Sequence, residues 1–414
     1  MKAEIIAVGS ELLTPDYLDT NSLFLTRGLR EAGFEVHLKS VVGDSAEDMA
    51  AVIRSALSRS SVILTSGGLG PTEDDITRRV VAEVLERPLR LDPALVEAIR
   101  ERFASRGYTM ASINERQAEV IEGAEILENP RGTAPGQWIE ARGVRLALLP
   151  GPPREIEPMF ESAVMPRLRR LGAGRRLAER SFRVIGLTES EVDARVAPIY
   201  TAYQPRVSTT ILAAAGHIAL RSSQWVAQGE QARELEELAA RIDQALGDAI
   251  YTTSDEPLEE IVGYLLAQSR RTVAVAESCT AGLLGWRITR VAGSSSYFLG
   301  GVLCYSNEVK TELCGVPREL LDQHGAVSAE VAEALARGVM RRFSSSIGLA
   351  VTGIAGPGGG TAEKPVGLVY VGIADSGQAV HFRRVLPGDR EAVRERAVFF
   401  ALAALRRFLL PPAP

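Results

Sequence analysis

Short apolar segments alternate with longer amphipathic segments along the first 65 residues. Strands are predicted at 5–8, 36–41 and 62–65, and helices at 21–32 and 45–57. Strands that alternate with helices form a parallel sheet that is covered by helices on both faces. This part of the chain is therefore expected to form an α/β domain of three layers.

A second region of alternation begins with a helix predicted at 258–268. It continues with strands at 272–276, 301–305, 347–352, 367–373 and 380–385 and with helices at 329–343 and 391–409. These segments predict a second, independent three-layer α/β domain.

The residues between these two regions follow a different pattern. Strands are predicted at 181–187, 207–213 and 218–222, with a long helix at 228–246. Thr188 and Glu191 have the spacing of a capping box at the start of a first helix. The order β-α-β-β-α-β resembles KH or ferredoxin-like folds, but the G-x-x-G loop and the stacking aromatics that hold RNA are missing. We expect a spacer or dimer element, with an RNA-binding module as the alternative.

The length and the turn-rich segments divide the chain into domains. At about 100–200 residues per domain, 414 residues argue for two or three. A charged segment with turn residues at 166–180 and a second break at 252–257 supply the boundaries. We predict a first domain over 1–168, a middle domain over 178–252 and a last domain over 256–412.

The composition excludes several classes of protein. The formal net charge is −5 and the four histidines are scattered, so we expect neither a basic field for nucleic acid nor a histidine metal cluster. Three cysteines without a C-x-x-C pair exclude a disulfide framework. No apolar run reaches the ~18–20 residues that span a bilayer, and Glu4 stands where a signal peptide is apolar. We expect a cytoplasmic protein without membrane or nucleic-acid partners.

A buried strand of the first domain runs into a loop that is rich in glycine. Gly67, Gly68 and Gly70 let a ligand approach the backbone, and N–H groups at the start of the next helix attract phosphate. Asp74 and Asp75 lie beside this position, where carboxylates are compatible with phosphate if a divalent cation bridges them. They are candidates for metal binding or water activation; the alternative is that they cap the helix.

Ser278 follows the predicted strand 272–276 at a strand-to-helix turn. Such a turn exposes a hydroxyl and surrounds it with helix N-terminal N–H groups that stabilise an oxyanion. No histidine lies nearby in the sequence, so a Ser-His-Asp triad has poor support. Lys310, one of four lysines, would replace histidine as the base if burial lowers its pKa. The alternative is a solvated lysine on an exposed turn.

Two further features of the last domain are suited to holding a substrate. The loop 352–360 follows a buried strand, and its glycines, Gly353 and Gly356 among them, let a substrate lie against the backbone. Arg390 and Arg394 at the start of the final helix have the chemistry to bind a phosphate, with a solvated helix face as the alternative. Spacing does not decide between the two arginines.

Four motifs of the first domain point to a known fold. They are Gly9-Ser10-Glu11-Leu12, Gly67-Gly68-Leu69-Gly70-Pro71-Thr72-x-Asp74-Asp75-Ile76-Thr77, Ala134-Pro135-Gly136 and Leu149-Pro150-Gly151-x-Pro153-x-Glu155. They resemble the molybdopterin-binding fold of the MogA and MoeA proteins, in the version that begins the CinA (competence/damage-inducible protein A) family. This resemblance implies hydrolysis of ADP-ribose to AMP and ribose 5-phosphate with a divalent metal (Mg, Mn or Co). The alternative is a domain that only binds a nucleotide or molybdopterin.

The resemblance also implies roles for individual residues of the first domain. It places Asp44 and Asp75 as an acidic pair in the site, where they are the catalytic candidates. Asp74, Asp75 and Glu11 are the candidates for holding the metal. The pyrophosphate would lie on a set of loop residues, Gly67, Gly68, Gly70 and Thr72.

Five motifs of the last domain point to the same family. They are Ala276-Glu277-Ser278-Cys279-Thr280-x-Gly282, Gly293-Ser294-Ser295, Tyr305-x-Asn307-x-x-Lys310, Thr352-Gly353-Ile354-Ala355-Gly356-Pro357-Gly358-Gly359 and Gly388-Asp389-Arg390. They resemble the CinA C-terminal domain, which is similar to the stand-alone PncC enzymes. This resemblance implies deamidation of nicotinamide mononucleotide (NMN) to nicotinic acid mononucleotide and ammonia, with no cofactor.

Carried over by position, the resemblance makes Ser278 the nucleophile and Lys310 the base that activates it. Tyr305 and Thr352 would assist in orienting the amide, and Cys279 would be a neighbour rather than the attacker. The residues implied in substrate binding are Ser295, Gly353, Gly356 and one of Arg390 and Arg394.

The two resemblances together predict a bifunctional hydrolase of pyridine nucleotide salvage. Its substrates would be NMN and ADP-ribose, and a homodimer is expected. A regulator associated with competence or DNA damage is the alternative that the family's name suggests. The net charge and the missing G-x-x-G loop argue against that alternative.

Overall fold

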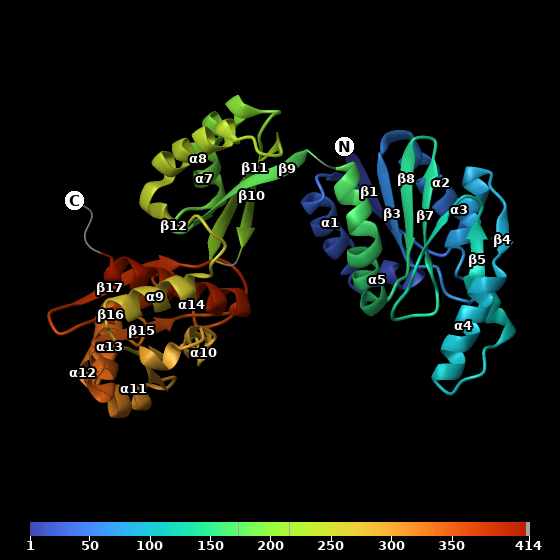
Figure 1. The fold of residues 1–414 in the computed structure, drawn as a ribbon. Helices are drawn as coiled ribbons and strands as arrows, with labels where there is room; N and C mark the ends of the chain where they lie inside the picture. The colour runs from blue at the N-terminus through green and yellow to red at the C-terminus, as the bar shows by residue number, and fades with distance from the viewer. Residues whose placement is uncertain (173, 215, 411–414) are drawn as a thin grey trace. The chain divides into compact units, whose positions relative to one another are not determined.

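The computed structural model describes residues 1–172, 174–214 and 216–410 (Figure 1). These residues form two compact units. The first holds residues 1–178 together with 225–232, and the second holds 179–224 with the described residues from 233 onward.

The first unit is built on a six-stranded sheet in the order β2-β1-β3-β8-β7-β6. Its strands are β1 (Lys2–Val8), β2 (Glu35–Val42), β3 (Val62–Ser66), β6 (Glu125–Leu127), β7 (Gly136–Ala141) and β8 (Val144–Leu149). Its helices are α1 (Asn21–Glu31), α2 (Ala46–Arg59), α3 (Thr77–Leu85), α4 (Pro93–Ser105), α5 (Pro153–Met159) and α6 (Met165–Leu171). A separate pair joins β4 (Leu89–Leu91) to β5 (Glu119–Ile121).

Alternate side chains of the central strands enter different cores. Ile63 belongs to the core with α2 and α3, whereas Leu64 belongs to the core with α1 and α5. Successive residues of a strand point to opposite faces, so a sheet with two apolar faces requires helices on both. The expected three-layer α/β architecture is confirmed (Figure 1).

The prediction of a parallel sheet is correct for only part of the first unit. β1, β2, β3 and β8 are parallel, but β7 and β6 are antiparallel to their neighbours. The cause is a hairpin between β7 and β8, whose two turn residues, Arg142 and Gly143, have φ of 52° and 77°. Two successive positive φ values are typical of the two-residue turn that joins antiparallel strands. The sheet is therefore mixed.

The segment 166–180, predicted as a domain boundary from its turn residues and charges, contains regular structure at both ends. Residues up to Leu171 belong to α6, and β9 begins at Arg175. Pro166 lies in the first turn of α6, which continues directly from a π-helical turn at Phe160–Val164. An ion pair between Arg169 and Glu31 (2.5 Å) joins α6 to α1.

The middle segment has the predicted order β-α-β-β-α-β. It comprises β9 (Arg175–Val184), α7 (Glu189–Tyr200), β10 (Ser208–Ala214), β11 (His217–Ala227), α8 (Arg233–Leu246) and β12 (Ile250–Thr252), in the sheet order β10-β11-β9-β12. The capping box is confirmed, because Thr188 N donates to Glu191 Oε2 (2.7 Å) and Glu191 N donates to Thr188 Oγ1 (3.3 Å). The second helix begins at Arg233 rather than at residue 228 because β11 extends to Ala227.

The last part of the chain forms a five-stranded mixed sheet in the order β14-β13-β15-β16-β17. Its strands are β13 (Val273–Glu277), β14 (Phe298–Leu303), β15 (Ile347–Gly353), β16 (Leu368–Ala374) and β17 (Ala379–Val385). Its helices are α9 (Leu258–Gln268), α10 (Leu283–Thr289), α11 (Asn307–Cys314), α12 (Arg318–His324), α13 (Ala329–Phe343) and α14 (Arg390–Leu409).

The three parallel strands of this sheet position the site. β13 lies between β14 and β15, so the carboxyl ends of all three meet at one edge. α9 and α14 pack on one face of the sheet and α13 packs on the other. Among the residues that the structure describes, no helix is both long and apolar enough to span a bilayer.

Candidate active sites

Ser278 is the first residue after the central strand β13. Its N–H donates to Val351 O (3.0 Å), which ties the start of the turn to β15. The turn then passes through Ala281 and Gly282, with φ of 49° and 95°, before α10 begins at Leu283. Ser278 thus lies at the start of a tight turn, with 8% of its surface exposed, and not at the first residue of a helix.

The Glu277 carboxylate accepts hydrogen bonds from backbone amides at the N-terminus of α10. It accepts from Gly282 N (2.9 Å), Leu284 N (3.0 Å) and Gly285 N (2.8 Å). The expectation that these helix amides face an oxyanion at Ser278 is therefore wrong. The amide groups left for that role belong to the turn itself.

Lys310 is buried in the first turns of α11, with 1% of its surface exposed. Its Nζ donates to Cys304 O (2.9 Å) and Tyr305 O (3.1 Å), at the end of β14. Burial is the main reason why the pKa of Lys310 is lowered from its ordinary value. The alternative of a solvated lysine is wrong, because the side chain packs inward from α11.

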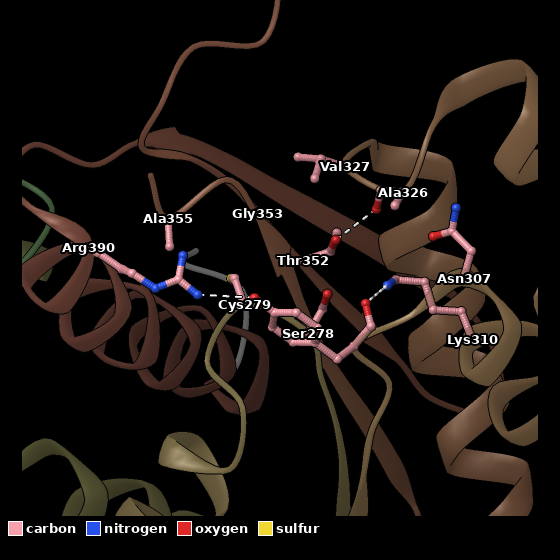
Figure 2. A pocket seen from close by; sticks show the side chains of 11 residues that line it. Ser278, Cys279, Asn307, Lys310, Ala326, Val327, Thr352, Gly353, Ala355 and Arg390 are labelled. Atoms are coloured by element: carbon pink, nitrogen blue, oxygen red, sulfur yellow. Dashed lines mark hydrogen bonds between the residues drawn. The ribbon is translucent and has the colours of Figure 1, made fainter. Parts of the chain in front are cut away.

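Ser278 and Lys310 line one cavity of about 210 Å³ at the carboxyl edge of the sheet. Figure 2 shows Lys310 reaching toward the side of the cavity where Ser278 lies. Within the described residues, no hydrogen bond joins Ser278 Oγ to Lys310 Nζ. The other lining residues are Cys279, Tyr305, Asn307, Ala326, Val327, Thr352, Gly353, Ala355 and Arg390.

Thr352 and Arg390 make defined contacts in this cavity. Thr352 Oγ1 donates to Ala326 O (2.7 Å), so toward a ligand the hydroxyl acts as an acceptor. Arg390 donates to Gly356 O (2.8 Å) and to the hydroxyl of Tyr305 (3.0 Å). Tyr305 is 60% exposed and lies at the mouth of the cavity.

Arg394 and Ser295 lie outside the cavity lining. Arg394 donates to Cys279 O (3.2 Å) and Thr280 O (3.0 Å), so it holds the turn after Ser278. Ser295 is exposed in a short 3-10 helix before β14. The structure thus brings Arg390, and not Arg394, to the cavity.

Cys279 and Asn307 also line the cavity. Burial raises the pKa of the Cys279 thiol to about 12, which keeps it protonated near neutral pH. Asn307 was not singled out as a site residue from the sequence. Its position three residues before Lys310, one turn apart on a helix, is the signal that points to it.

The first unit contains a cavity of about 360 Å³ where β1, β3 and β8 end. The glycine loop forms one wall, and a Cβ at Gly67 would overlap the carbonyl oxygen of Val8. Gly67, Gly68 and Gly70 line the cavity, whereas Thr72 lies outside it. The remaining lining residues are Val8, Gly9, Glu11, Asp44, Leu69, Asp74, Asp75, Gln117, Thr133, Ala134, Pro150, Gly151, Pro152 and Glu155.

Asp75 organises the glycine loop. Its carboxylate accepts from Gly70 N (2.7 Å), Thr72 N (2.9 Å) and Thr72 Oγ1 (2.5 Å). Asp44 is tied instead to the loop after β1, because its Oδ2 accepts from Ser10 N (3.0 Å). Asp74 is exposed at the cavity, and a hydrogen bond from Thr72 is the first cause of its lowered pKa.

Two buried residues of this cavity region escaped the sequence analysis. Arg78 is 3% exposed and donates to Leu69 O (2.8 Å) and Gly70 O (3.0 Å) beneath the loop; burial lowers its pKa to about 10. Glu155 accepts from Asn129 Nδ2 (2.9 Å). Glu155 stands in a quoted motif, but nothing in the sequence distinguishes Arg78 from the many other arginines.

The carboxylates around this cavity are spread out. In the part of the chain that the structure describes, no three His, Cys, Asp or Glu side chains gather into a metal-ligand set. Magnesium is usually held by only one or two carboxylates together with substrate phosphates. The carboxylates that line this cavity are Glu11, Asp44, Asp74, Asp75 and Glu155.

Three family models match consecutive parts of the chain. The probable molybdopterin binding domain matches residues 4–170, the damage-inducible protein CinA KH domain matches 179–252, and the CinA C-terminal domain matches 255–409. The α/β organisation into a molybdopterin-binding-type domain, a small KH-like domain and a C-terminal CinA domain is therefore confirmed.

Relatives extend this likeness over the full length. A CinA-like protein of Koribacter versatilis is 49% identical over 99% of this chain and 100% of its own length. A putative competence-damage inducible protein of Symbiobacterium thermophilum is 45% identical over 99% of both chains. A solved CinA superfamily structure from Klebsiella pneumoniae is 32% identical over 37% of this chain and 98% of its own, with a TM-score of 0.36. By this full-length identity, the chain belongs to the CinA family.

Proposed function

We propose that the C-terminal domain hydrolyses the carboxamide of NMN to release ammonia. The observation that carries this proposal is that one cavity is lined both by Ser278, at the turn after β13, and by the buried Lys310. Burial lowers the pKa of Lys310 and so favours the neutral amine, the form that can accept a serine proton. The family resemblance supports NMN as the amide.

The reaction follows from these two groups. Ser278 Oγ attacks the carboxamide carbon while its proton passes to Lys310 Nζ. The C–N bond then breaks, the proton goes to the departing nitrogen, and ammonia leaves an acyl-serine. Water gives a proton to Lys310 and attacks the acyl carbon. The bond between that carbon and Ser278 Oγ then breaks, Lys310 returns the proton to Ser278 Oγ, and nicotinic acid mononucleotide leaves. Backbone amides of the turn would hold the oxyanion.

Thr352 has the chemistry to bind the carboxamide end of NMN, and Arg390 has the chemistry to bind its phosphate end. The Thr352 hydroxyl, already donating to Ala326, can accept from the carboxamide NH₂. Arg390 has a guanidinium at the cavity and only neutral oxygens as partners within the described residues. A phosphate is a stronger partner for a guanidinium than a tyrosine hydroxyl.

Arg390→Gln is therefore expected to raise KM for NMN by about 10- to 100-fold, since a charge-assisted hydrogen bond contributes about 1.5–3 kcal/mol. KM for nicotinamide riboside, which lacks the phosphate, should not change. Steady-state ammonia release with both substrates measures the difference. The control is Arg396→Gln on the same helix, whose side chain contacts Pro387 O. An unchanged KM for NMN in Arg390→Gln would rule out this role.

We propose, second, that the first domain hydrolyses ADP-ribose to AMP and ribose 5-phosphate. The observation that favours it is the cavity of about 360 Å³ in which a glycine loop faces Glu11, Asp44, Asp74 and Asp75. A divalent cation held by one or two of these carboxylates would neutralise the pyrophosphate when bound. Arg78 places a positive charge beneath the same loop.

Asp75→Asn is expected to lower ADP-ribose hydrolysis by at least about 100-fold, because loop order and a carboxylate are both lost. NMN deamidation by the same preparation should stay at the wild-type rate. AMP formation with Mg²⁺, Mn²⁺ or Co²⁺ is the measurement. Glu73→Gln is the matched control, since Glu73 belongs to the same loop but pairs with Arg116 (2.6 Å). Binding of ADP-ribose or a pterin without AMP formation by the wild type would leave only the binding function.

A further inference from the structure

Glu277 is a carboxylate buried without a cation. It is 1% exposed, and its two oxygens accept three amide N–H groups at 2.8–3.0 Å. Within the described residues no Lys, Arg or His lies in ion-pair distance of it. Burying a carboxylate is costly unless hydrogen bonds replace its water, and a serine or aspartate at the N-cap usually serves a helix start.

Arg394 holds the same turn from its carbonyl side. From α14 it donates to Cys279 O and Thr280 O at 3.2 and 3.0 Å. The Glu277 carboxylate therefore holds the last residue of the turn, Gly282, and the first amides of α10, while the Arg394 guanidinium holds two carbonyl groups of the turn. Figure 2 shows Ser278 and Cys279 between the strand ends and α14.

The turn needs such support because its conformation is strained. Ala281 has φ 49°, a left-handed value that is unfavourable for a residue other than glycine. A strained turn persists only when its surroundings over-determine it. On the side of α10 and α14, Glu277 and Arg394 supply polar contacts that support this turn.

We infer that Glu277 and Arg394 are positioning residues that together set the direction of Ser278 Oγ toward the reacting carbon. This rests on the proposed deamidase function of Ser278. Neither side chain is needed to bind NMN, because the substrate-facing groups lie elsewhere in the cavity. Losing either contact should therefore lower kcat and leave KM almost unchanged.

The test compares Glu277→Gln, Arg394→Gln and Arg394→Lys in the full-length protein. Glu259→Gln is the matched control: Glu259 is a 6% exposed carboxylate of the same domain that pairs with Arg287 of α10 (3.3 Å) but does not touch the turn. Two readouts are taken on folded protein, namely kcat and KM for NMN, and the rate at which a fluorophosphonate labels Ser278.

We expect Glu277→Gln to lower kcat by about 100-fold, the size of effect that a small misplacement of a reacting group produces. Arg394→Gln should lose about 10-fold or more, and Arg394→Lys should recover part of it. KM should stay within threefold, and labelling should slow in parallel with kcat. If Glu277→Gln does not fold, the test is made with Arg394→Gln and Arg394→Lys alone, because Arg394 is only half-buried.

Normal kcat and normal labelling in Glu277→Gln and Arg394→Gln would overturn the inference, as would an equal loss in Glu259→Gln. If the wild type releases no ammonia, the deamidase proposal fails, and labelling still decides: slower labelling in the variants supports positioning. A wild type whose Ser278 is not labelled overturns the inference too.

Discussion

Ser278→Ala is expected to abolish ammonia release from NMN, with a loss of at least about 10³-fold in kcat. Removing the nucleophile of a serine hydrolase leaves only the catalysis due to binding and oxyanion stabilisation. No other hydroxyl follows β13 at the same place, since Thr280 is fully buried. Release is measured with a chelator present, and it should be insensitive to the chelator in the wild type.

Cys279→Ala is the control for this prediction, because Cys279 is the adjacent residue and lines the same cavity. Its thiol is held protonated by a pKa raised to about 12, so its removal should change kcat by only a few-fold. Activity that survives Ser278→Ala and disappears in Cys279→Ala would mean that the thiol is the nucleophile.

Lys310→Met should lower kcat by at least about 10³-fold, since it removes the group that accepts the serine proton. The pH dependence provides a second measurement. Burial favours the neutral amine, so kcat/KM of the wild type should rise with pH through the lowered pKa of Lys310. It should level off below 10.5, the ordinary value for lysine.

Lys364→Met is the matched control, because Lys364 also donates to two carbonyls, His324 O (2.6 Å) and Val327 O (2.9 Å). It supports the loop that carries Val327 into the cavity, but it is not among the residues that line the cavity. We expect a change mainly in KM. Loss of the same rising limb in Lys364→Met would contradict the assignment of that limb to Lys310.

Elements with clear sequence signals at their ends were predicted to the residue. Helix 258–268 follows Pro257, and helix 329–343 follows Ser328, whose hydroxyl caps it at Val331 N (3.4 Å). The β7–β8 hairpin was missed because Arg142-Gly143 is not one of the usual hairpin dipeptides. Local signals therefore sufficed for these two helices but not for the β7–β8 hairpin.

In the candidate site too, some features could be predicted from the sequence and others depend on the fold. The sequence places Ser278 after a strand, but the burial of Lys310 depends on how α11 packs against the end of β14. Glu277 stands next to Ser278 in the chain, yet only the folded turn brings three amides onto its carboxylate. Arg390 and Arg394 are one helical turn apart, so only the structure separates their contacts.

The placement of α14 affects the order in which the two cavities arise during protein synthesis. All lining residues of the first cavity have been translated by Glu155, whereas the second requires Arg390, and its serine turn requires Arg394. Domains generally fold as units from the N-terminus as the ribosome advances. A nascent chain stalled before α14 would thus carry every lining residue of the first cavity but would lack Arg390 and Arg394 at the second.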